Sequence, residues 1–168
     1  MSVTATGTIG KAMAKLVAHL SNSATWQAAC GASNAAGALR SIYWPYCDYQ
    51  ATARPLIVVA PDENQSETRV SGGASTLTLP TGELFVMVCR DDDGAYTESD
   101  NWVLMDNLVY GIIDDLKDLS GVSDNLNMTG FRIGPHTCSH PTTVATGGDA
   151  ESNPPIWETK FVVEWGAL

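Results

Sequence analysis

Apolar residues recur at helical spacing in the first part of the chain. Between residues 8 and 20 they fall three or four positions apart, while Lys11 and Lys15 occupy the other side. This pattern predicts an amphipathic helix over residues 8–20. Its apolar positions are Ile9, Met13, Leu16, Val17 and Leu20.

A second, shorter helix is expected directly afterwards. Ser21-Asn22-Ser23 ends the first helix, and Thr25 is a suitable capping residue for a short helix that holds Trp26. Gly31 ends this second helix, and residues 35–39 are expected to add one or two further helical turns.

Two later segments are apolar at every position rather than at alternate ones. Leu56–Ala60 follows Arg54-Pro55, and Leu84–Cys89 lies inside a run from Glu83 to Arg90. Strands of this kind are covered on both faces by a helix, a second sheet or a partner subunit. Between them, residues 62–75 predict a long polar loop with a short strand near residues 68–70, and Thr81-Gly82 predicts a turn.

The longest helical pattern runs from Ser99 to Leu119. Gly111 lies in its middle, where glycine costs about 1 kcal/mol relative to alanine, so we interpret it as the mark of a close packing contact. The predicted apolar stripe consists of Trp102, Met105, Leu108, Val109, Ile112, Leu116 and Leu119.

The last quarter of the chain predicts two strands. Asn127 to Gly134 forms the first, residues 136–155 form a loop, and Ile156 to Trp165 alternates cleanly between apolar and polar positions. The whole pattern predicts one α+β domain over residues 1–168, with an antiparallel sheet of about four strands and helices packed on one face. The expected dry face of the last strand holds Trp157, Thr159, Phe161, Val163 and Trp165.

The net charge limits the kinds of partner that the chain can bind. The 168 residues include 19 acidic and nine basic ones, for a net charge of −10. This excess opposes a protein that grips nucleic acid or docks on anionic membranes, but not one that DNA slides past. The N-terminus lacks the pattern of a signal peptide and no segment is long and apolar enough to span a bilayer, so we expect synthesis in the cytoplasm and free thiols at the four cysteines.

The sharpest candidate for metal binding is His136-Thr-Cys138-Ser-His140. In an extended strand His136, Cys138 and His140 share one face, and imidazole and thiolate are good zinc ligands. The alternatives are a polar strand edge and a site completed between subunits. If the chain is a structural protein rather than a metal-binding module, alanine at these three residues should change stability by less than about 0.5 kcal/mol, as at exposed sites.

Other chemistry finds little support in the sequence. It contains no nucleophile elbow and no nucleotide-binding glycine loop, so we expect neither an enzyme nor a bound cofactor. Asp91, Asp92 and Asp93 do not follow the order of a calcium loop and are read as a solvated turn that can meet a basic patch on a partner. Tyr43 and Trp44 are expected in the core or at a subunit contact.

Five segments together point to a known family. They are the N-terminal helix, Trp26–Gly31 followed by Ala38–Tyr43, Ala53–Val59, Gly82–Val88 before a long helix, and the closing strand that ends in Val163-Glu164-Trp165. With these segments the chain resembles the tail terminator proteins of long-tailed bacteriophages, including the related neck and tail-completion proteins.

The resemblance implies a structural virion protein made in the cytoplasm of a host bacterium. It implies a homo-oligomeric ring, a hexamer, that ends the tail tube and joins the tail to the head–tail connector. Its partners would be the tail tube protein and the connector protein, and DNA would only pass through the lumen. In such a ring the apolar strand, through Leu84, Val86 and Val88, would lie at subunit contacts. The alternatives are a neighbouring neck subunit and, from a different class, a small metal-binding module.

Overall fold

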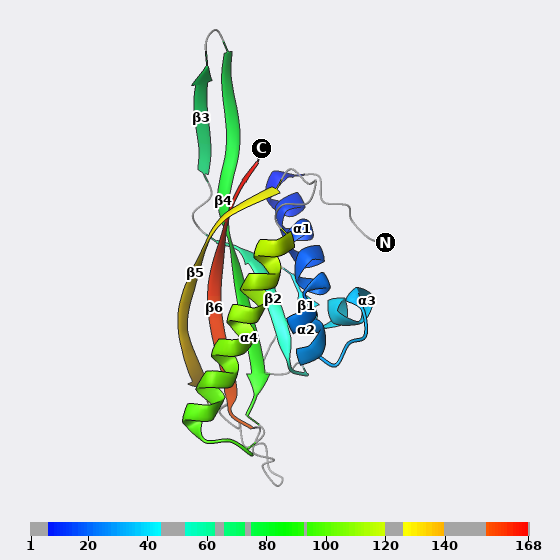
Figure 1. Ribbon diagram of the computed structural model, residues 1–168. Coiled ribbons are helices and arrows are strands. Elements are labelled where there is room, and N and C mark those ends of the chain that lie inside the picture. Colours follow the sequence, from blue (N-terminus) through cyan, green and yellow to red (C-terminus); the bar gives the residue numbers. More distant parts are fainter. Residues whose placement is uncertain are drawn as a thin grey trace, which may run out of the picture.

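The computed structural model of the chain describes residues 7–44, 53–62, 66–72, 75–92, 94–119, 126–139 and 154–167 (Figure 1). Three helices come first, one long helix lies in the middle, and strands occupy the rest. The elements are α1 (Thr8–Asn22), α2 (Ala24–Ala29), α3 (Ala35–Ala38), the 3-10 turn η1 (Leu39–Ser41), β1 (Ile42–Tyr43), β2 (Leu56–Pro61), β3 (Ser66–Gly72), β4 (Ser75–Asp91), α4 (Glu98–Leu119), β5 (Leu126–Ser139) and β6 (Ile156–Ala167).

The sheet is mixed but mostly antiparallel. Five strands follow one another in the order β1-β2-β4-β6-β5, and β3 pairs with β4 outside this path. Among the described strands, only the two-residue β1 runs parallel to its neighbour. The predicted α+β class is therefore confirmed. The expected number of about four strands was slightly low, because the pattern did not reveal β1 and indicated β3 only as a short strand near residues 68–70.

The central strand β4 is much longer than predicted. Thr81-Gly82 is not a turn, because the strand passes through both residues and pairs there with β6. The stretch predicted as a long loop contains β3, which pairs with the first part of β4 from Ser66 to Gly72. Figure 1 shows this antiparallel pair standing out beyond the helices and the other strands.

The main core lies between one face of the sheet and the helices. Figure 1 shows α1 and α4 running along this face. All five residues predicted on the dry face of β6 are buried, which confirms the alternation. The helices contribute Met13, Leu16, Val17, Leu20, Trp26, Met105, Val109, Ile112, Ile113 and Leu116 to this core.

The opposite face of the sheet carries a smaller apolar cluster. Leu56 and Val58 from β2, Met87 and Cys89 from β4, and Ile156 from β6 form it. The continuous apolar runs in β2 and β4 are explained by these two clusters, since alternate residues face the helices and the second cluster.

Helices α2 and α4 meet at a close contact. A Cβ atom added to Gly111 would lie 2.7 Å from Cγ2 of Thr25, so the predicted packing contact at this glycine is confirmed. The predicted cap of α2 was wrong by two residues. Ser23 is the N-cap, and its side chain accepts a hydrogen bond from the Trp26 N–H.

Candidate functional site

A bulge in β5 decides which side chains face the start of α4. The pairing of β5 with β6 slips by one residue between Ile133 and His136. Gly134-Pro135 occupies this slip, where the missing N–H of proline is tolerated. Because of the extra residue, both Ile133 and His136 face the helices, and Cys138 follows His136 on that face. The predicted strand end at Gly134 was therefore wrong, since β5 continues to Ser139.

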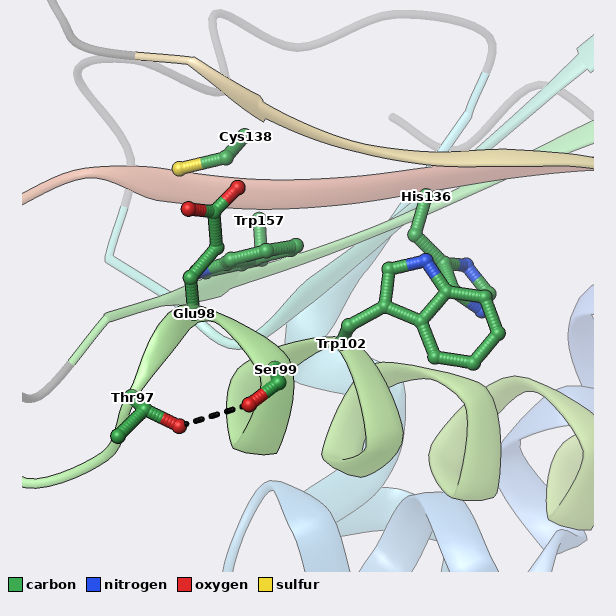
Figure 2. Close-up of a pocket in the computed structure, with 7 residues that line it drawn as sticks. All are labelled: Thr97, Glu98, Ser99, Trp102, His136, Cys138 and Trp157. Atoms are coloured by element: carbon green, nitrogen blue, oxygen red, sulfur yellow. Dashed lines mark hydrogen bonds between the residues drawn. The ribbon is translucent and has the colours of Figure 1, made fainter.

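An open hollow of about 640 Å³ lies where α4 begins beside β5 and β6. Figure 2 shows the Glu98 carboxylate pointing toward Cys138, with Trp102 beside His136. The hollow is lined by Thr97, Glu98, Ser99, Trp102, His136, Cys138 and Trp157. His136 and Cys138, two of the three residues considered for metal binding, both line it.

His136 is a buried part of the packing rather than an exposed ligand. Its side chain is only 4% exposed, and both ring nitrogens have partners. Nδ1 lies 2.6 Å from Oγ1 of Thr159, and Nε2 lies 3.1 Å from Oδ1 of Asp106. The Trp102 ring packs edge-on against the imidazole at a centroid distance of 4.8 Å. The small effect of alanine expected at an exposed site therefore does not apply to His136, because the β5 bulge turns its side chain under α4.

The carboxylate, imidazole and hydroxyl of Asp106, His136 and Thr159 follow one another as in a nucleophilic triad. A nucleophile must reach its substrate, however, and Thr159 is fully buried. These hydrogen bonds therefore connect α4 to β5 and β6 and satisfy their buried polar groups.

Cys138 is exposed and carries a free thiol. Although the residue is exposed, partial burial of its thiol and then the negative charges of Asp92 and Glu98 raise the pKa of this thiol above its ordinary value. Since the thiolate is the nucleophile and the metal ligand, these surroundings disfavour both roles.

The predicted metal site does not assemble from the described residues. His136 and Cys138 share one face of β5, as predicted, while His140 lies outside the described part of the chain. Within residues 7–44, 53–62, 66–72, 75–92, 94–119, 126–139 and 154–167, no three His, Cys, Asp or Glu residues gather closely enough to hold a metal ion.

The acidic residues at the end of β4 form contacts within the subunit. Asp91 forms an ion pair with Arg54. Asp92 accepts hydrogen bonds from the Gly94 N–H at 2.9 Å and from Asn101 Nδ2 at 3.1 Å. The Gly94 bond is the main reason that the pKa of Asp92 lies below its ordinary value. Asp93 lies outside the described residues.

The structure places the residues predicted at subunit contacts in different environments. Leu84, Val86 and Val88 are fully buried beneath the helices of their own chain, so their side chains do not form a contact surface on the folded subunit. Tyr43 packs partly buried against the second apolar cluster. Trp44 is 42% exposed and remains available to a partner.

The sequence reading missed the apolar surface of α4. The helical spacing predicts Trp102 on the buried stripe, yet its side chain is 48% exposed. Val103 and Tyr110 are exposed to a similar degree. The helical spacing could have indicated this, because one face of α4 is already filled by a complete buried stripe. Its members are Asn101, Met105, Val109, Ile112, Ile113 and Leu116. Any further large apolar residues on this helix must then face outward.

A second hollow lies on the other side of Trp102. It measures about 280 Å³ and is lined by Asp106 and Tyr110 of α4 and by residues 133–136 of β5. The surface of α4 along β5 is thus an uneven strip of aromatic side chains and hollows, which suits contact with another protein better than an isolated small-molecule pocket does.

Comparison with known proteins adds no relative. No protein-family model matches this sequence, and no curated protein matches it either. Among the helices in the described part of the chain, none combines the length and the apolar character needed to cross a membrane.

Proposed function

We propose that this chain is a structural virion protein that forms a homo-oligomeric ring, terminates the phage tail tube and joins the tail to the head–tail connector. The resemblance noted in the sequence supplies the kind of assembly and the subunit number, six. The surface of the subunit supports assembly as its role.

The observation that carries the proposal is the group of large apolar side chains that α4 exposes. Trp102, Val103 and Tyr110 are 48%, 51% and 48% exposed, and Tyr96 just before the helix is 49% exposed. Single exposed apolar residues are ordinary, whereas a cluster of large apolar residues on the surface is typical of a contact surface. Aromatic residues are also the usual anchors of protein interfaces.

The projecting pair of β3 and β4 supports the same role. Among the described strands, β3 pairs with β4 alone. An open strand edge is a template for another chain. A subunit of a tail ring needs such reach, since it must contact the tube on one side and the connector on the other.

The segments that carry the resemblance lie together in the fold. Ala53–Val59 leads into β2, Gly82–Val88 lies in β4, and Val163-Glu164-Trp165 lies in β6. These three strands are neighbours in the sheet, and α1 and α2 cover them. Three of the segments that carry the resemblance are therefore adjacent in the sheet.

Electron microscopy of the purified protein at high concentration tests the proposal. We expect closed rings with a central channel. Monomers in the images, together with a monomer mass by light scattering at the same concentration, would overturn it.

A further inference from the structure

The charges of the chain are divided between two parts of the fold. Residues 1–47 contain three basic residues and no acidic one, so the remaining 121 residues hold six basic and 19 acidic residues. Helix α4 alone carries six acidic residues and one lysine. Along the sequence, residues 1–47 therefore carry a net charge of +3 and residues 48–168 a net charge of −13.

The negative part coincides with exposed aromatic surface. We name Glu98, Trp102, Val103 and Tyr110 the α4 patch. Glu98 is exposed, and the two hollows beside Trp102 contain carboxylates but no lysine or arginine among their lining residues. The pKa of the Cys138 thiol in the larger hollow is raised, first by burial and then by the negative charges of Asp92 and Glu98.

The positive part has exposed apolar surface of its own. We name Leu39, Arg40 and Trp44 the corner patch, which spans η1 and the end of β1. Leu39 is 45% exposed, Trp44 is 42% exposed, and Arg40 between them is exposed. An arginine beside apolar groups suits a contact with aromatic faces and a carboxylate, because its guanidinium stacks on rings and is weakly hydrated.

The two patches lie toward opposite edges of the sheet. The corner patch belongs to the β1 edge, and the α4 patch lies along β5, the other edge strand. Figure 1 shows the start of α4 beside β5 and the α3 region on the far side of α1 and α2. Two different patches at opposite ends of a subunit can join only head to tail, which produces rings or filaments.

We propose that the occupant of the α4 patch is a second copy of this chain, which docks its corner patch there. Arg40 of one subunit then lies against Glu98 and the Trp102 ring of the next. This inference rests on the proposed ring, and names the surfaces that build it. It explains why both patches expose large apolar groups and why their charges are opposite.

Charge reversal tests the contact directly. Glu98→Lys and Arg40→Glu should each weaken self-association at least about tenfold, because each places like charges opposite one another. The double variant, Glu98→Lys with Arg40→Glu, restores the pairing and should recover most of the association. Lys160→Glu, a reversal at an exposed position outside both patches, is the matched control and should associate like the unmodified chain. Sedimentation velocity over a concentration series measures all five proteins, and circular dichroism checks that each is folded.

The outcomes separate this inference from the ring itself. Association of the unmodified chain that neither single reversal weakens would overturn the contact while leaving the ring proposal standing. Two folded single variants that are weakened, with a double variant that is no better than either, would also overturn the pairing of these patches. An unmodified chain that stays monomeric at every concentration would overturn both proposals.

Discussion

The Ser23 hydroxyl donates a hydrogen bond of 2.6 Å to Oδ2 of Asp115, which joins the start of α2 to the C-terminal half of α4. The Thr25 N–H donates to the same oxygen at 2.9 Å. Burial by itself would raise the pKa of Asp115, but the hydrogen bonds from Ser23, Thr25 and Ala24 outweigh it and hold this pKa below its ordinary value of 3.8. The ionised carboxylate is therefore the form that the fold stabilises.

Asp115→Asn should lower the free energy of unfolding at pH 7 by about 1 kcal/mol, because it turns charge-assisted hydrogen bonds into neutral ones. A folded-state pKa below the unfolded value means that this stabilisation is complete above the unfolded pKa of about 3.9 and is lost as pH falls through the folded value. The difference between the two proteins should thus stay constant above about pH 5 and shrink below pH 4.

Urea unfolding from pH 3 to pH 7 measures this difference. Asp114→Asn is the control, since the Asp114 side chain is 70% exposed and pairs with Lys117 on the surface. It should change stability by no more than about 0.5 kcal/mol. A difference for Asp115→Asn that does not depend on pH would show that its charge is unimportant.

Gly111→Ala should destabilise the chain although alanine favours helices. Its Cβ would lie 2.7 Å from Cγ2 and 2.9 Å from Oγ1 of Thr25, and a threonine side chain in a packed contact cannot move aside freely. Overpacking of this kind costs about 1–3 kcal/mol, against a helical gain of about 1 kcal/mol. Thr25→Ala removes both contacting atoms, so the double variant should be more stable than Gly111→Ala alone. Thermal unfolding of the three variants decides the matter, and a Gly111→Ala chain that melts above the unmodified one would refute the contact.

His136→Ala should lower stability by about 1–3 kcal/mol, because it leaves the buried Thr159 hydroxyl without its partner at 2.6 Å. This replaces the smaller effect expected from the sequence alone. Cys138→Ser, two residues further along the same face and exposed, should stay within about 0.5 kcal/mol of the unmodified chain. Equal, negligible effects of both changes in urea unfolding would contradict the assignment of His136 to the packing.

Asn101→Ala should also cost about 1–3 kcal/mol. Asn101 is fully buried; it donates to Asp92 at 3.1 Å and accepts from Arg90 Nη2 at 3.1 Å. Its loss would leave polar groups at the junction of β4 and α4 unsatisfied. Asn107→Ala, on the exposed side of the same helix, is the matched change and should be neutral or slightly stabilising. Chemical denaturation that finds the two variants equally stable would rule out this network.

Elements with strong apolar periodicity were predictable from the sequence. The alternation from Trp157 to Trp165 identified the buried face of β6, and the spacing from Met13 to Leu20 identified that of α1. In both cases burial of one face dominates the local choice of residues. The antiparallel pair of β3 and the first part of β4 was predicted only as a short strand near residues 68–70, because its sequence, rich in Ser, Thr and Gly, lacks that signal.

The candidate surface was only partly predictable for a different reason. One extra residue at Gly134-Pro135 changes which side of β5 faces the helices, and hydrophobic patterns do not register a single inserted residue. The same limitation applies to α4, where Trp102 fits the helical spacing but lies one position beyond the buried stripe. Exposed aromatic residues and charge asymmetry became meaningful only once the fold placed them at two opposite edges.

Native mass spectrometry of the purified chain tests the central claim most directly, because it counts subunits. A ring of six copies predicts one dominant species at six times the 17.8 kDa subunit mass. A single species at the subunit mass, unchanged at the highest attainable concentration, would contradict the account.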